Sequence, residues 1–289
     1  MNRRQLGNTS LEIPVIGIGT WQYNSGIQPI QAGLALGAAL IDTAESYGSE
    51  EIVGQAIQGS RRDVFLATKV SPRHFRYENV VRSAEASLKR LKTDYLDLYQ
   101  LHWPNYTIPI EETMAAIETL VDAGKVRFIG VSNFMLPDLK KAQRAMKKHP
   151  IVSNQVRYSL IDRTIENDLL EYCQKQDITV IAYSPLATGL AQIQAMDPGR
   201  VLERLARIHS RTVAQIALSW CISKKCVVTI PKTSSVAHVR ENCAASDFQL
   251  PAEELELLDR SVRYRRRNGF EIRLRRIARH TLQVVGRNQ

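Results

Sequence analysis

The stretch VIGIGTWQ, residues 15–22, decides between the two α/β folds that the rest of the chain permits. Its apolar, partly β-branched start predicts a buried strand. A doubly wound dinucleotide-binding sheet carries G-x-G-x-x-G directly after its first strand. Here the GIG of residues 17–19 is followed by TWQ, so the third glycine of that pattern is missing. The stretch therefore disfavours the doubly wound fold and favours a barrel.

Outward from this strand, apolar runs alternate with amphipathic stretches along the chain. Several runs show no polar alternation, as expected for parallel strands buried on both faces. Strands are predicted at residues 15–21, 39–42, 64–70, 95–102, 126–132, 151–156, 179–184 and 227–231. Helices are predicted at about residues 28–38, 49–58, 77–91, 110–122, 135–147, 166–176, 211–224 and 235–246. Eight strand–helix units predict an α/β protein with a (β/α)₈ TIM barrel.

The ends of the chain differ from this repeating body. A GNTS turn at residues 7–10 predicts an N-terminal β-hairpin that closes the bottom of the barrel. No linker or repeat divides residues 1–259, which we expect to form a single (β/α)₈ barrel domain. Residues 260–289 contain ten Arg, no Lys and one Glu, a charge of +9 within a total of +10. We treat them as an Arg-rich C-terminal tail of uncertain structure.

Composition limits the classes of function. With 44% hydrophobic residues, the chain can build a large core, and it has no secretory start and no apolar run long enough for a membrane helix. The four cysteines form no zinc-like spacing, which predicts no metal site and a cytoplasmic protein with reduced thiols. Because the basicity is confined to the tail, nucleic acid is disfavoured as the main partner.

The tail permits three interpretations. It could be a solvated or partly disordered basic end. Its apolar residues among arginines could instead form an amphipathic basic helix for a membrane surface or an acidic partner. It could also fold over the barrel mouth, where its arginines would favour anionic substrates.

Four titratable residues occupy matching places in the predicted barrel. Asp42 ends the second strand, Tyr47 follows in the next loop, Lys69 lies near the end of the third strand, and His102 ends the fourth. Each alone could have an ordinary structural role. Because the carboxyl ends of barrel strands surround one mouth, however, we expect all four to converge there as a catalytic group.

These side chains suit proton transfer to an oxygen. A free phenol has a pKa of about 10, and a neighbouring ammonium group lowers it. We therefore expect Lys69 to lower the pKa of Tyr47, with Asp42 holding Lys69 as its ion-pair partner. Tyr47 would then act as a general acid, and His102 would hydrogen-bond the substrate oxygen beside it.

The four residues and their surroundings resemble the catalytic tetrad of the aldo-keto reductase family, over about residues 4–260. The motifs that carry the resemblance are IDTAESYGSEEIVG (41–54), ATKV (67–70), DYLDLYQLHWP (94–104), GKVRFIGVSNF (124–134), NQVRYS (154–159), YSPLATG (183–189) and IPKTSSVAHVREN (230–242). The resemblance implies NADPH-dependent reduction of aldehydes or ketones to alcohols, with hydride from the nicotinamide and a proton from Tyr47. His102 stands where members that reduce steroid carbon–carbon double bonds carry glutamate, which favours carbonyl reduction.

The same resemblance implies the cofactor contacts. Ser132, Asn133 and Gln155 would bind the carboxamide, and Tyr183 would stack on the nicotinamide ring. The remaining contacts of the nicotinamide and pyrophosphate half would be Thr20, Trp21, Asp42, Ser184, Leu186 and Thr188. Trp21 and Trp103 match walls of the substrate pocket, which Tyr47 and His102 complete.

The adenosine end departs from the family pattern. Lys232 and Thr233 match residues that hold the 2′-phosphate, and Glu241 and Asn242 match positions near the adenine. His238 stands where NADP-binding members usually carry arginine, and a neutral imidazole offers less to a phosphate than a guanidinium does. We therefore expect NADPH to be preferred by a smaller margin than usual, with NADH as an open alternative.

A different class of function is also open. The chain could be a catalytically slow, cofactor-binding regulatory subunit, like the channel-associated members of the family. We favour a reductase that acts on small-molecule carbonyl compounds, slightly favour a monomer, and expect a membrane surface only through the tail.

Overall fold

Eight parallel strands form the centre of the molecule. The computed structural model describes residues 1–285, and its large sheet runs in sequence order from the first strand to the last. The strands are β3 (Ile18–Gly19), β4 (Leu40–Asp42), β5 (Phe65–Val70), β6 (Leu96–Leu101), β7 (Val126–Ser132), β8 (Ile151–Arg157), β9 (Thr179–Tyr183) and β10 (Val227–Thr229). All eight predicted strands are confirmed, although several are shorter than the apolar runs that contain them.

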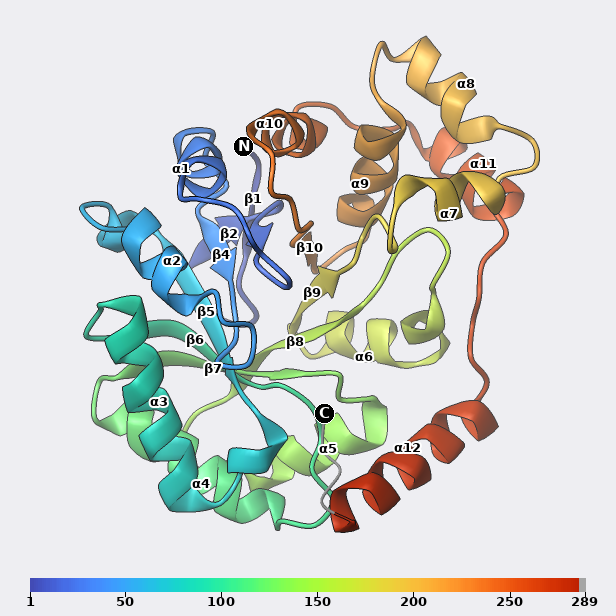
Figure 1. Ribbon diagram of the computed structural model, residues 1–289. Coiled ribbons are helices and arrows are strands. Elements are labelled where there is room, and N and C mark those ends of the chain that lie inside the picture. Colours follow the sequence, from blue (N-terminus) through green and yellow to red (C-terminus); the bar gives the residue numbers. More distant parts are fainter. Residues whose placement is uncertain (286–289) are drawn as a thin grey trace.

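The sheet closes on itself between its first and last strands. Parallel bridges join Ile16 to Thr229 and Gly19 to Lys232, beyond the short ladders of β3 and β10. The backbone N–H of Gly17 donates to the carbonyl of Thr229 at 2.8 Å, and the N–H of Thr229 donates to Val15 at 2.8 Å. The (β/α)₈ barrel predicted from the sequence is therefore the observed fold (Figure 1).

Helices surround this ring of strands in Figure 1. Those predicted from the sequence are α1 (Gln28–Ala35), α2 (Glu50–Ala56), α3 (Tyr77–Leu91), α4 (Ile110–Asp122), α5 (Leu136–Ala145), α6 (Leu169–Lys175), α9 (Val213–Ser223) and α10 (Val236–Cys243). Four more lie outside that set: α7 (Leu190–Ala195), α8 (Val201–Ile208), α11 (Ala252–Ser261) and α12 (Gly269–Val284), of which only α12 corresponds to one of the interpretations of the tail. The first two lie in the long connection after β9, and the last two follow the barrel.

Local chemistry explains where the helices begin and end. At the start of α9, Thr212 and Gln215 form a reciprocal capping box, with hydrogen bonds of 3.2 and 3.0 Å. Helix α3 buries Val80, Ala84 and Leu91 on the stripe that faces the sheet, and it ends at Lys92 in a left-handed conformation. Helix positions thus follow from apolar periodicity together with caps.

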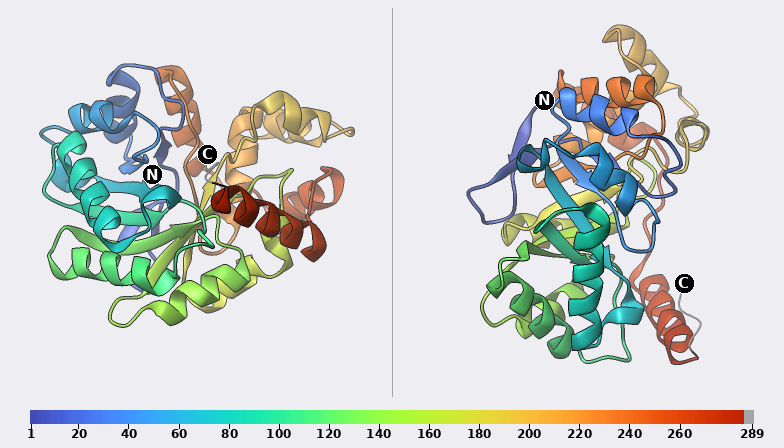
Figure 2. Two further views of the ribbon diagram at one scale, coloured as in Figure 1. Left: turned by 60° about the horizontal axis from the view of Figure 1, so that its bottom comes forward. Right: turned by 60° about the vertical axis from the view of Figure 1, so that its left-hand side comes forward.

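The predicted N-terminal hairpin is also confirmed. Strands β1 (Arg3–Gln5) and β2 (Glu12–Pro14) pair in an antiparallel ladder. Leu6 and Ile13 of the hairpin are fully buried in one cluster with barrel residues such as Leu98. In the right-hand view of Figure 2, the hairpin and α12 lie on opposite sides of the barrel. The hairpin therefore covers the end of the barrel away from α12, and the other end is left for a site.

The core has an inner and an outer layer. The inner layer fills the barrel between the strands with residues such as Leu40, Ala67 and Val228, and the outer layer packs helices onto the strands. Towards the carboxyl ends of the strands, the buried side chains become polar, including Asp42 and Lys69. Charged side chains are rarely buried unless they are paired. Their presence at the carboxyl ends of the strands marks that end of the barrel as the candidate site.

Part of the Arg-rich tail forms a helix that contacts the barrel, although most of the side chains of residues 263–285 are exposed to solvent. Backbone hydrogen bonds of 2.9 Å join Arg265 to Ile161 and to Arg163, and α12 follows. Near its end, the buried amide of Gln283 donates to the carbonyl of Pro104 at 2.8 Å and accepts from the N–H of Tyr106 at 2.9 Å. Helix α12 is therefore packed against the loop that follows β6. In residues 1–285, no helix combines the length and apolarity needed to cross a membrane.

Candidate active site

The four titratable residues predicted from the sequence meet at the carboxyl ends of the strands. Asp42 ends β4, Lys69 lies in β5, His102 directly follows β6, and Tyr47 lies in the loop after β4. The structure brings them into a connected group, because each touches at least one of the others. Barrel topology explains this convergence of residues that are up to 60 positions apart, from Asp42 to His102.

A buried ion pair forms the base of the group. The Nζ atom of Lys69 lies 2.6 Å from Oδ1 of Asp42 and also donates to the carbonyl of Thr43 at 2.8 Å. The Lys69 side chain is fully buried. Burial alone would lower the pKa of Lys69, but the negative charge of Asp42, with a contribution from Tyr47, outweighs it and raises the pKa. Lys69 is therefore a fixed cation.

The second oxygen of Asp42 is also satisfied. The side-chain amide of Gln155 donates to Oδ2 at 2.7 Å, and that of Gln100 donates to the same atom at 3.2 Å. With both carboxylate oxygens hydrogen-bonded and Lys69 in place, the buried negative charge is stabilised. Asp42 thus positions Lys69 and has little freedom to act on a substrate directly.

Tyr47 and His102 form the partly buried outer side of the group. The Tyr47 hydroxyl lies 3.2 Å from Nε2 of His102, and Nζ of Lys69 lies 4.8 Å from the centre of the Tyr47 ring. Burial raises the pKa of Tyr47, and the lowering effect of Lys69 is not large enough to compensate. The expected lowering by Lys69 is therefore present, but the net shift of the pKa is upward because the phenol is desolvated.

The surroundings of His102 favour its neutral form. Burial, followed by the positive charges of Lys69 and Arg279, lowers the pKa of His102 to about 3. A neutral imidazole has one donor and one acceptor nitrogen, so Nε2 can exchange a hydrogen bond with Tyr47 or with an oxygen that approaches both. The geometry places a phenol and a neutral imidazole side by side as hydrogen-bonding groups.

The predicted carboxamide-binding residues are also together. The Tyr183 hydroxyl donates to Oδ1 of Asn133 at 2.8 Å, and Nδ2 of Asn133 donates to Ser132 and to the carbonyl of His102, each at 3.0 Å. Asn133 has a positive φ of 63°, a conformation that asparagine tolerates better than most residues. Ser132 also donates to the carbonyl of Gln155 at 3.0 Å. One network therefore joins β7, β8 and β9 to His102.

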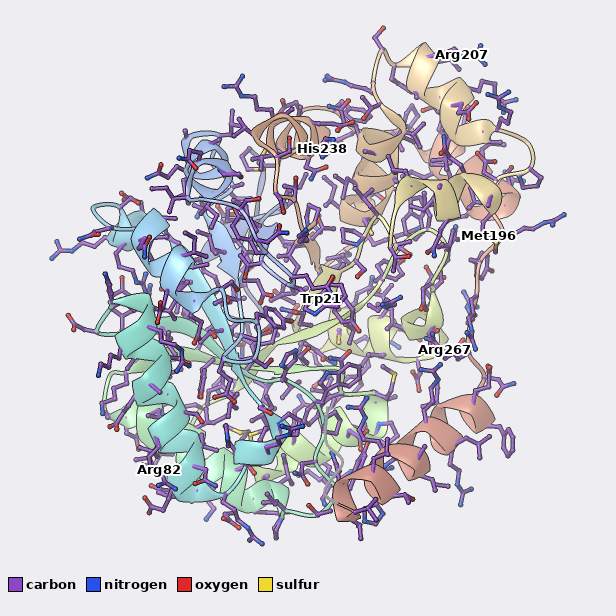
Figure 3. All side chains as sticks on the ribbon, viewed as in Figure 1. Trp21, Arg82, Met196, Arg207, His238 and Arg267 are labelled. Atoms are coloured by element: carbon purple, nitrogen blue, oxygen red, sulfur yellow. The ribbon has the colours of Figure 1, made fainter. Side chains whose placement is uncertain are left out.

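Thr20 and the two tryptophans lie on the loops around the group. The Thr20 hydroxyl is buried and donates to the carbonyl of Asp42 at 2.9 Å, so it supports β4. Trp21 is 52% exposed and lies at the centre of the ring in Figure 3. Trp103 directly follows His102 and is partly buried. An exposed tryptophan in this central position suits the wall of an open site better than a core role.

The remaining predicted cofactor contacts lie on two neighbouring segments. Ser184, Leu186 and Thr188 form the loop after β9, which includes positive φ angles at Ser184 and Ala187. The other segment follows β10 and continues into α10, where His238 lies near the upper edge of Figure 3. It carries the exposed Lys232 and His238, the partly buried Glu241, and the buried Thr233 and Asn242. Since β9 and β10 are adjacent, these segments lie side by side.

Two residues of the site were not identified from the sequence. Gln100 contacts Asp42, and it could have been found from strand periodicity, because it lies two positions before His102 and faces the same side of β6. Arg279 of α12 lies over the ring of Trp103, with 3.7 Å from Cζ to the ring centre. One interpretation of the tail placed its arginines over the mouth, but the sequence did not single out Arg279, since its contact depends on how α12 packs. The described part of the chain holds no cluster of three or more potential metal ligands.

Comparison with known proteins agrees with this geometry. Residues 15–263 match the model of the aldo/keto reductase family. The chain is 40% identical to methylglyoxal reductase YeaE of Escherichia coli (strain K12), covering 87% of this chain and 92% of that one. It is 36% identical to glyoxal reductase of Bacillus subtilis (strain 168), covering 87% and 90%.

Solved structures give the same result. An aldo-keto reductase from Klebsiella pneumoniae in complex with NADPH is 40% identical, with a TM-score of 0.86 and coverage of 92% of this chain and 98% of that one. The thermostable aldo-keto reductase Tm1743 is 42% identical, with a TM-score of 0.84 and coverage of 90% and 99%. Fold, site geometry and sequence similarity lead to one conclusion. The chain belongs to the aldo/keto reductase family.

Proposed function

We propose that this protein reduces aldehydes or ketones to alcohols with NADPH, and that Tyr47 donates the proton to the carbonyl oxygen. The observation that carries the proposal is the contact of 3.2 Å between the Tyr47 hydroxyl and His102, beside the buried pair of Lys69 and Asp42. A carbonyl oxygen that met both Tyr47 and His102 would receive two neutral hydrogen-bonding groups at one point. This arrangement suits protonation of an oxygen as negative charge develops on it.

The donor set around the mouth fits a nicotinamide dinucleotide. Amide and hydroxyl groups of Asn133, Ser132 and Gln155 match the hydrogen-bonding needs of a carboxamide, and Tyr183 offers an aromatic face. The loop after β9 carries the predicted pyrophosphate contacts Ser184, Leu186 and Thr188, and positive φ angles at Ser184 and Ala187 set its path. When bound, the reduced nicotinamide supplies a hydride for the carbonyl carbon. A solved relative in this family is described as a complex with NADPH.

Each of the four side chains has its own role in the proposed proton transfer. The raised pKa of Tyr47 keeps the phenol protonated at neutral pH, which is the form that a general acid needs. The fixed cation of Lys69 favours the phenolate that remains once the proton has left. Asp42 holds Lys69 in place, and neutral His102 orients the oxygen beside Tyr47.

The adenosine end supports NADPH with a modest margin over NADH. Lys232 is exposed beside the loop that would hold the phosphates, and His238 is the nearest candidate for a second contact on α10. An ammonium binds a phosphate as a point charge, whereas the usual arginine fork would add paired hydrogen bonds. Curated relatives are named methylglyoxal reductase and glyoxal reductase, so small dicarbonyl compounds belong in the first substrate panel.

The test is oxidation of NADPH and of NADH with methylglyoxal, glyoxal and benzaldehyde, on the parent protein and on Tyr47→Phe. Loss of the general acid should lower kcat by about 10²–10⁴-fold while NADPH binding is retained. Tyr77→Phe is the matched control, because its exposed hydroxyl contacts Thr119 away from the mouth. Equal turnover by Tyr47→Phe and parent would contradict the proton-donor role.

The same experiment separates the alternative function. Tight NADPH binding without turnover of any aldehyde would favour the slow, cofactor-binding regulatory subunit. Binding of neither nicotinamide cofactor would contradict both functions. We further propose a monomer, which measurement of the mass in solution tests.

A further inference from the structure

Arg279 is a partly buried cation at the edge of the candidate site. Its guanidinium carbon lies 3.7 Å from the centre of the Trp103 ring, and Trp103 directly follows His102. Within residues 1–285, no carboxylate forms an ion pair with Arg279, and none of its nitrogens donates a side-chain hydrogen bond to a protein group. A partly desolvated guanidinium without an anion is unusual, because buried charge is normally paired.

The other tail arginines near the barrel show that carboxylates were available for pairing. Arg276, three positions earlier on the same helix, pairs with Asp138 at 3.2 Å. Arg266 and Arg267 pair with Glu166 and Asp162, at 2.7 and 3.2 Å. Arg276 and Arg266 also lie over aromatic rings, Tyr106 and Tyr264, at 5.0 and 5.5 Å. Arg279 differs from them because it has no carboxylate partner within residues 1–285 and lies closer to its ring, at 3.7 Å from the centre of Trp103. Stacking on that ring uses the face of the guanidinium and leaves its N–H edge available for a planar, bidentate anion.

The position of Arg279 is fixed by contacts on both sides of it along α12. Before it, Arg276 is held by Asp138, whose carboxylate also accepts from the Tyr106 hydroxyl at 3.0 Å. After it, the Gln283 amide is bonded to the backbone of Pro104 and Tyr106. The loop after β6 therefore carries His102, Trp103 and the docking site of α12 together. Arg279 is close enough to His102 for its charge to contribute to the lowered pKa of that residue.

We propose that Arg279, stacked on Trp103, is an anion subsite that binds the carboxylate of the carbonyl substrate. The inference rests on the proposed reductase function and adds a substrate class: aldehydes or ketones that carry a carboxylate some distance from the reacting carbonyl. The carbonyl oxygen lies at Tyr47 and His102, while the carboxylate accepts from the guanidinium at the rim. Arg279 thereby orients the substrate without taking part in proton or hydride transfer.

The experiment compares acids with their neutral esters. We would measure kcat/KM for 3- and 4-carboxybenzaldehyde, and for the methyl ester of each, on the parent, Arg279→Met and Arg279→Lys. For Arg279→Met, kcat/KM should fall for the better acid by about 10–100-fold more than for its ester, since a charged, bidentate hydrogen-bond pair is lost. Arg279→Lys should recover part of the difference, because it restores the charge without the planar fork.

Arg273→Met is the matched control. Arg273 lies on the same helix, is exposed, and is about 120° away from Arg279 around the helix axis. This variant removes one positive charge from α12 but should leave the ratio of acid to ester within about twofold of the parent. If Arg273→Met changes the ratio as much as Arg279→Met does, the positive charge of α12 as a whole explains the preference for acids, and a subsite at Arg279 is excluded.

Other outcomes would overturn the proposal directly. Equal losses on acid and ester in Arg279→Met would mean a structural role for Arg279, and no loss on either acid would mean that no carboxylate binds there. If the parent turned over no aldehyde, the proposed function would fail, and benzoate and benzamide would then be the probes, with binding measured by calorimetry. Benzoate binding that is lost in Arg279→Met and retained in Arg273→Met would still establish the subsite, and its retention in Arg279→Met would exclude it.

Discussion

Two side chains whose neutral forms are favoured, Tyr47 and His102, lie 3.2 Å apart where the proposed reaction would protonate a carbonyl oxygen. Both are neutral for the same reason, because burial disfavours the phenolate of Tyr47 and the imidazolium of His102. Lys69 favours ionisation of Tyr47 and opposes ionisation of His102, so one buried cation acts on the two residues in opposite directions. At the residue scale, the site is defined by charge state as well as by side-chain identity.

The lowered pKa of His102 predicts a pH dependence of stability. An unfolded chain binds a proton at this histidine below about pH 6.5, whereas the folded protein does so only near pH 3. The unfolded state therefore holds more protons in this window, and the free energy of unfolding falls as the pH decreases through it. Between pH 7.5 and 5.5 this residue should account for a loss of about 1 kcal/mol.

The comparison of parent and His102→Gln by urea unfolding at these two pH values measures that contribution. The variant should lose about 1 kcal/mol less than the parent on acidification, because glutamine does not titrate. The double difference cancels the effects of all other titrating groups that the substitution leaves unchanged. An identical change in both proteins would mean that His102 titrates in the folded state much as it does in the unfolded chain.

At the scale of elements, α12 is attached to the barrel through polar residues. Arg276, Arg279 and Gln283 face the loop after β6, whereas Phe270 and Ile277 are 69% and 54% exposed. The helix thus has its polar side inward, which is the reverse of an ordinary surface helix. The exposed apolar residues of α12 lie among arginines, the pattern from which a membrane-surface role was predicted. That role stays a prediction.

Gln283 should control whether α12 stays attached. Its amide makes two hydrogen bonds to backbone groups at 2.8 and 2.9 Å, and Gln283→Ala would leave a buried carbonyl and a buried N–H without these partners. Trypsin cleavage within α12 should become about 10–100-fold faster, since local opening becomes less costly. Thr281→Ala is the control, because that exposed hydroxyl bonds only to Ile277 in its own helix. Equal cleavage rates in Gln283→Ala and Thr281→Ala would exclude Gln283 as the anchor.

At the scale of the whole molecule, the barrel depends on a narrow seam between its first and last strands. The regular part of β3 is two residues long, and isolated bridges on either side complete the closure. At Gly19 a Cβ atom would lie 2.6 Å from the carbonyl oxygen of Ile230, which belongs to the opposite side of the seam. A side chain at this position would force two backbones apart.

Gly19→Ala should therefore destabilise the closed barrel, by about 1–3 kcal/mol, the usual range for overpacking. The midpoint of urea unfolding, measured by circular dichroism, would shift to lower urea. Gly199→Ala is the control, because its Cβ atom would make only an ordinary contact of 3.6 Å with Val201. Similar midpoints for the two variants would show that the seam can widen at little cost.

The eight strands, most of the helices and the places of the four central residues could be predicted from the sequence. Unalternating β-branched runs report burial on both faces, and a barrel brings the carboxyl ends of all its strands to one mouth, whatever their separation. Asp42 and Lys69 lie at or near the ends of their strands, and His102 directly follows its strand. Their proximity could therefore be predicted from the barrel topology alone. The resemblance of the surrounding motifs supplied the roles that we now propose.

The charge states of the site residues and the packing of the tail helix α12 depend on the tertiary structure. Whether burial or Lys69 controls the pKa of Tyr47 depends on how many neighbours exclude water from the phenol, a sum over the whole fold that no local motif contains. The sharing of Asp42 by Gln100 and Gln155 depends on side chains from three strands. The contact of Arg279 with Trp103 depends on the angle at which α12 packs, because helix periodicity alone does not say which face meets the barrel.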